Sequence, residues 1–107
     1  MLSVFGETDS ALSADDLAKV LDSGEWRVSR GRHAIRLQGP DCVCALEAAD
    51  RGYLLRDGID GPEEIAGARS LSTHLAARGL RHRVEVYDTG SNLVAYFHRE
   101  WPRAVRD

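Results

Sequence analysis

The chain has 107 residues, of which 43% are hydrophobic and 29% charged, and its formal net charge is -3 at pH 7. This size and composition predict one globular domain over residues 1–107 that buries its core without metal or disulfide help. The negative charge excludes a general electrostatic attraction to nucleic acid or to an anionic membrane, so either would need a local basic patch.

The cysteines and the first residues bear on the cellular compartment. Cys42 and Cys44 are separated by one residue, and a disulfide between them would close a strained small ring. Residues 1–7 have neither a basic start nor a sustained apolar run, so they do not resemble a secretory signal. No stretch has the length of a membrane span. We therefore expect a cytoplasmic protein with reduced thiols and no membrane association.

The N-terminal part predicts one short helix. Residues 1–12 are expected to form a loosely ordered lead-in, with room for a short strand at residues 2–5. Ser13, followed by two aspartates, is typical of a capped helix start, and Gly24 is placed to end the helix. At about ten residues this helix cannot stand alone and must dock on the rest of the chain. Its apolar stripe consists of Leu17, Val20 and Leu21.

Residues 25–38 predict a β-hairpin. If Gly31-Arg32 forms a two-residue turn, Val28 lies opposite Ile35 and Trp26 lies opposite Leu37. The same register places Arg27 opposite Arg36 on the other face. Two further strands are expected at residues 42–48 and 53–56, each bounded by turn-forming residues.

A long amphipathic helix is predicted at residues 62–78. Proline in the first turn and carboxylates near the start suit the N-terminal end of a helix, and Gly79 suits the residue that follows its C-terminal end. Apolar and small residues recur at helical spacing and form one stripe that should face a sheet. These residues are Ile65, Ala68, Leu71, Ser72, Leu75 and Ala76.

The last two strands, at residues 81–87 and 93–98, flank a stretch rich in turn formers. A loop of two or four residues aligns Val84 and Val86 with Leu93, Ala95 and Phe97, which gives one fully apolar face. An odd loop aligns them with Val94, Tyr96 and His98 instead. Because a slip of one residue exchanges the two faces, we favour the first register.

Together these elements predict an α+β domain in the order α-β-β-β-β-α-β-β. Short connections favour antiparallel neighbours, so we expect a mainly antiparallel sheet of about six strands with the long helix packed on one face. The sequence contains no motif of a known family. The order of elements is similar, in topology alone, to that of small secretion chaperones, which are acidic dimers.

The favoured register leaves an aromatic surface on the outer side of the last hairpin. Aromatic residues and arginine are enriched where protein–protein binding energy concentrates. We therefore expect a non-enzymatic interaction or regulatory module that binds a protein partner or a second copy of itself. An alternative is that the N-terminal helix covers this surface within one molecule. The candidate partner-binding residues are Tyr87, Val94, Tyr96, Trp101, Arg83 and Arg99.

A second hypothesis is anion or nucleic-acid binding through the hairpin at residues 25–38. Like charges directly opposite one another are destabilising unless an anion or a carboxylate lies between them. The plainer explanation is that Glu25, or acidic residues elsewhere in the fold, neutralise these arginines in solvent. A compositional preference explains why 13 of the 14 basic residues of the whole chain are arginine. Given the negative net charge, we consider nucleic acid an unlikely partner. The candidate residues are Arg27, Arg30, Arg32 and Arg36.

Enzymatic activity is the less favoured hypothesis. His82 and His98 could be neighbours at the open end of the last hairpin and form a small acid–base or ligand site. There is no glycine-flanked serine elbow and no phosphate-binding glycine loop, so we expect no catalytic residues of those classes. The single cysteine pair and the acidic run at residues 57–64 both depart from metal-site spacing, so neither a metal nor a cofactor is expected.

Overall fold

The computed structural model describes residues 2–101, without the side chain of Asp57. The described residues form two helices and one sheet of seven strands, so the expected α+β class with a mainly antiparallel sheet is confirmed. All neighbouring strands run antiparallel, in the order β2-β3-β4-β5-β1-β6-β7. The elements are β1 (Ser3–Asp9), α1 (Ala14–Leu21), β2 (Arg27–Arg30), β3 (Ala34–Gly39), β4 (Cys42–Ala49), β5 (Gly52–Asp60), α2 (Glu64–Ala77), β6 (Arg81–Tyr87) and β7 (Leu93–Arg99).

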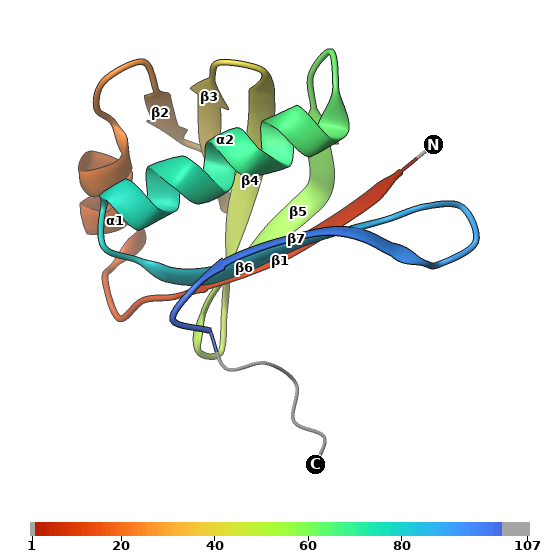
Figure 1. The fold of residues 1–107 in the computed structure, drawn as a ribbon. Coiled ribbons are helices and arrows are strands. Elements are labelled where there is room, and N and C mark those ends of the chain that lie inside the picture. The colour runs from red at the N-terminus through yellow and green to blue at the C-terminus, as the bar shows by residue number, and fades with distance from the viewer. Residues whose placement is uncertain (1, 102–107) are drawn as a thin grey trace.

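Strand β1 corrects both the predicted strand number and the predicted order. Residues 3–9 form a regular strand between β5 and β6, close to the middle of the sheet, where we expected a loosely ordered start (Figure 1). Val4 and Thr8 point to the buried side, and the Thr8 hydroxyl donates a hydrogen bond of 2.7 Å to the carbonyl oxygen of Arg81 in β6. Gly6 and the polar residues around it weaken the alternation of apolar and polar residues that would have indicated this strand.

Both helices lie on the same side of the sheet (Figure 1). The predicted apolar stripe of α2 is confirmed, because Ala68, Leu71 and Leu75 are buried against the sheet. The predicted cap of α1 is also confirmed: the Ser13 hydroxyl accepts a hydrogen bond of 3.2 Å from the backbone N–H of Asp16. We call the side of the sheet that the helices cover the inner face and the opposite side the outer face.

Helix α1 does not reach the last hairpin. Its fully buried Leu17 and Leu21 anchor it at the opposite end of the sheet, where it packs against β2 and β3. The idea that this helix covers the aromatic side of the last hairpin is therefore wrong. Within the described part of the chain, both helices pack on the inner face, and neither crosses to the outer one.

The first hairpin, β2–β3, turns one residue later than the sequence predicted. Gly31 donates its backbone N–H to the carbonyl of Ala34 at 2.8 Å, so these two residues lie opposite one another and Arg32-His33, rather than Gly31-Arg32, form the two-residue turn. Val28 consequently pairs with Leu37, not with Ile35, and Trp26 lies just before the strand. The indole of Trp26 fills the space above Gly39, where any side chain would collide with it. This contact accounts for the slip of two residues in the predicted register.

The last hairpin, β6–β7, has the register that we favoured for Ala95 and Phe97, but the prediction is wrong for Leu93, which a bulge places opposite Tyr87 and which is 51% exposed. Val84 pairs with Phe97 and Val86 pairs with Ala95, so the apolar side of both strands faces α2. Tyr87 pairs with Leu93 across a bulge. None of the helices among residues 2–101 is long and apolar enough to cross a membrane.

Candidate functional site

The outer face between β5 and β7 is the most unusual surface of the molecule. Side chains alternate along a strand, so each buried residue of the inner face has neighbours on the outer face. Three large apolar side chains stand there in solvent: Phe5 is 58% exposed, Leu54 46% and Val94 45%. Exposed apolar side chains grouped on one face often mark an interaction site, whereas single ones need no explanation.

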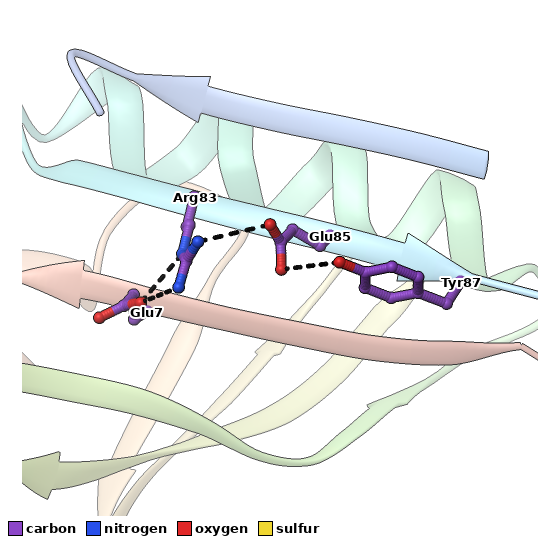
Figure 2. Close-up of polar contacts among 4 residues, drawn as sticks. All are labelled: Glu7, Arg83, Glu85 and Tyr87. Atoms are coloured by element: carbon purple, nitrogen blue, oxygen red, sulfur yellow. Dashed lines mark hydrogen bonds and ion pairs between the residues drawn. The ribbon is translucent and has the colours of Figure 1, made fainter. Parts of the chain in front are cut away.

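A row of polar contacts crosses the middle of this surface (Figure 2). Arg83 of β6 donates through Nε to Glu7 Oε1 of β1 at 2.9 Å and through Nη1 to Glu85 at 3.4 Å. Tyr87 donates its hydroxyl to Glu85 at 3.3 Å. Burial alone would lower the pKa of Arg83, but the hydrogen bond and the charge of Glu7 outweigh it and raise the pKa. The guanidinium therefore stays charged.

Trp101, the last residue that the structure describes, places its aromatic ring on the same surface. The guanidinium carbons of Arg81 and Arg83 each lie 5.4 Å from the centre of the Trp101 ring. Arg81 is also held by an ion pair of 2.7 Å with Asp9 of β1. Trp101 and Leu54 line one hollow of about 300 Å³. The outer face thus offers an indented surface on which the charged groups of Glu7, Asp9, Arg81, Arg83 and Glu85 are paired with one another.

Five of the six predicted partner-binding residues lie on the outer face. Arg99 does not, because its side chain reaches past the end of α2 and donates to the carbonyl of Gly79 at 3.4 Å. Sequence reasoning missed Phe5 and Leu54, the first because residues 1–12 were expected to be a loose lead-in with at most a short strand at residues 2–5. The alternation of Phe5 with Val4 was the available signal, but it was too short to be decisive. The five residues are Arg83, Tyr87, Val94, Tyr96 and Trp101.

The four arginines of the first hairpin do not converge. Arg30 lies on the inner face and forms an ion pair of 2.8 Å with Asp15 of α1. Arg27 pairs with Gln38 and not with Arg36, so the predicted arginine pair across the strands is wrong. The residues therefore divide between the two faces and the loop, where Arg32 lies. Anion binding by this hairpin stays a prediction that no contact among the described residues supports.

His82 and His98 lie on opposite faces of the sheet. His98 stacks on Tyr96 on the outer face, with ring centres 5.0 Å apart. His82 is fully buried, and its Nε2 lies 2.6 Å from the Ser72 hydroxyl of α2 while its Nδ1 lies 2.9 Å from the carbonyl of Leu80. A carbonyl can only accept, so Nδ1 carries the proton and Nε2 accepts from Ser72. This serine–histidine pair resembles a nucleophile and its base, but burial withholds it from any substrate.

The buried imidazoles predict a loss of stability in acid. Burial lowers the pKa of His82, and likewise that of His74, whose ring stacks on Trp26 at 4.7 Å. The unfolded chain then binds protons at a higher pH than the folded chain does. The free energy of unfolding should therefore fall below pH ~6.5, by up to about 1.4 kcal/mol per pH unit for each histidine.

Thermal melts across about pH 7.5 to 5.5 measure this effect. His82→Gln should be less stable at neutral pH but should show a shallower fall in acid. His33→Gln is the matched control, because that imidazole is exposed in the loop of the first hairpin. A wild-type protein whose melting temperature is the same at both ends of the range would contradict the neutral, buried imidazole.

Metal and thiol chemistry find no support in the geometry. Among residues 2–101 no group of three or more histidine, cysteine, aspartate or glutamate side chains is arranged to hold a metal ion. Cys42 and Cys44 are free and buried, with sulfur atoms 3.8 Å apart. The hydrogen bond shared with Cys42 and burial raise the pKa of Cys44, so its thiol is a poor nucleophile.

Comparisons with known proteins do not assign the chain to a family. No protein-family model, no curated protein and no solved structure matches it.

Proposed function

We propose that the protein is a non-enzymatic interaction module that binds a protein partner through the outer face of β1, β5, β6 and β7. The observation that carries this proposal is that both helices lie on the inner face while the outer face keeps Phe5, Leu54 and Val94 exposed. A stable monomer gains nothing from apolar side chains in water. A partner that removes them from water gains about 25 cal/mol for each Å² of apolar surface buried.

The charge pattern favours a protein over a nucleic acid. In the central strands β1 and β6, three carboxylates lie beside two arginines, and those arginines are engaged in ion pairs at 2.5–3.4 Å. A phosphate backbone is held by arginines and lysines that are free to displace its counterions. Aromatic rings beside paired charges instead resemble the centre of a protein interface. The residues are Glu7, Asp9, Glu85, Arg81 and Arg83.

The arrangement gives less support to an enzyme. The groups that could perform acid–base chemistry are either buried, as His82 and Ser72 are, or stand on an open surface, as His98 does. Catalysis needs a nucleophile or a base that a substrate can reach in a site that excludes water. We also propose a cytoplasmic location, where the two free thiols would stay reduced.

Affinity capture with a matched pair of variants tests the proposed function. Phe5→Glu places a charge in the middle of the outer face, whereas Lys19→Glu places the same charge on the exposed side of α1. A protein captured from the source cells should bind the wild-type chain and Lys19→Glu equally. Its affinity for Phe5→Glu should fall at least about tenfold, because the charge must be buried.

The captured protein is then purified and its binding measured directly. Both variants must keep the melting temperature of the wild type within a few degrees, so that binding and folding are separated. If purified partners bind Phe5→Glu as tightly as the wild type, the outer face is not the binding surface and the proposal is wrong.

A further inference from the structure

The two edges of the sheet are built differently. Strand β2 is four residues long, carries an arginine at each end, and has its Val28 N–H capped at 3.2 Å by the carboxylate of Asp22. Strand β7 is seven residues long, and its sequence, LVAYFHR, has one permanent charge, at the last position. No described strand pairs with its outer side. Natural sheets guard their edges with short strands and charges, and a long uncharged edge is a site for pairing.

The backbone of β7 presents unpaired groups to solvent at alternate residues. The carbonyl of Arg81 accepts a hydrogen bond from Thr8, so it points toward β1. Directions alternate along an antiparallel strand, and the backbone groups of Val84 therefore point toward Phe97 in β7. The backbone N–H and C=O groups of Phe97 therefore point toward β6, away from the free edge. By the same alternation, Tyr96 and His98 direct N–H and C=O to the free edge, and the alternation ends at Ala95, where the register with β6 shifts.

These two residues are placed for antiparallel pairing with the same strand of another molecule. With Tyr96 opposite Tyr96 about a twofold axis, the two Tyr96 residues exchange N–H and C=O groups, and His98 of each copy lies beside the bulge at Val94 of the other. The two Tyr96 rings meet on the outer face, where aromatic pairs stabilise a sheet. The only permanent charges of β7, at Arg99, fall at opposite ends, beside the exposed Leu93 of the other copy.

We infer that a second copy of this chain docks on the free edge of β7, antiparallel and centred on Tyr96, and doubles the seven-stranded sheet. A second copy, unlike an unrelated strand, brings two Tyr96 rings together at the twofold axis. Antiparallel pairing keeps the positive ends apart, and the resulting dimer carries one outer face of twice the width. The inference names one partner for the proposed interaction module, and in this respect it rests on the proposed function. The edge and the outer face are separate surfaces and can be tested separately.

Opposite charges at the twofold position test this pairing. Tyr96→Lys and Tyr96→Glu each place two like charges directly opposite one another in the dimer. In sedimentation velocity, the wild type should be a dimer at micromolar concentration, and each variant alone should dissociate at least about a hundredfold more readily. An equal mixture of the two variants should form a heterodimer, since Lys then lies opposite Glu.

A variant that adds no charge separates the loss of the dimer from a loss of folding. His98→Pro removes one N–H at the free edge but no hydrogen bond to β6, so the monomer should fold while the dimer is lost. Lys19→Glu should remain a dimer. The inference is overturned if the wild type stays monomeric up to millimolar concentration. It is also overturned if an equal mixture of Tyr96→Lys and Tyr96→Glu forms no heterodimer. If Phe5→Glu loses a partner while the Tyr96 variants keep the wild-type state, the edge fails and the proposed function stands.

Discussion

Leu75→Ala is expected to lower the free energy of unfolding by about 2–5 kcal/mol, because truncating a buried leucine loses transfer energy and leaves a cavity. Leu75 is 2% exposed and lies on the side of α2 that packs on the sheet. Small domains have only about 5–15 kcal/mol of stability in total. The melting temperature should therefore fall by roughly 10 °C or more.

Thr73→Ala is the matched control, since Thr73 is exposed on the same helix. Its effect should stay within about 0.5 kcal/mol. Arg69, which is exposed on the same helix, is a poorer control because its guanidinium lies 5.6 Å from the centre of the Phe97 ring. Calorimetric melts of both variants settle the orientation. If Thr73→Ala unfolds and Leu75→Ala does not, α2 is rotated and the two faces of the sheet are exchanged.

Gly52→Ala is expected to be as damaging, for a reason of backbone geometry. Gly52 begins β5 and pairs with Asp9 of β1, with a φ of 152° that other residues rarely adopt. A Cβ at this position would collide with the carbonyl oxygen of Thr8. A rigid backbone cannot move aside without breaking the pairing of β1 with β5. We expect a loss of about 3 kcal/mol or more, from a strained φ together with the displaced strand.

Gly24→Ala separates the two causes. Gly24 also has a positive φ, 61°, but nothing lies within 4 Å of the position of a Cβ. Its substitution should cost only the conformational strain, about 1 kcal/mol. Chemical denaturation of the two variants gives the comparison. Equal losses would show that Gly52 does not lie against β1, and the central position of β1 in the sheet would then be wrong.

The sequence predicted the faces of the elements better than their pairing partners. Burial follows periodicity, so the buried stripe of α2 and the alternation in β6 could be found from residue types alone. A slip of two residues leaves every side chain on the same face, which is why Val28 could be paired with Ile35 when Leu37 is its partner. The contact of Trp26 with Gly39 fixes that register, and such tertiary contacts are not visible in the local pattern.

The candidate site was only partly accessible for the same reason. Tyr87 and Tyr96 could be placed on one side of a hairpin because both their strands are adjacent in sequence. Phe5 joins them from the other end of the chain, through a pairing of β1 with β6 that spans more than seventy residues. His82 could not be separated from His98 until the inner and outer faces were known.

Side-chain NMR with a soluble paramagnetic agent tests the outer face most directly. In a dilute sample, the methyl groups of Leu54 and Val94 should relax strongly, whereas those of Val84 and Leu37 should be protected. A purified partner that binds the wild type more tightly than Phe5→Glu is then added. In the complex, the methyl groups of Leu54 and Val94 should also be protected from the paramagnetic agent. Protection of Leu54 and Val94 already in the dilute, unbound chain would contradict an open face. Unchanged relaxation in the complex would contradict its role in binding.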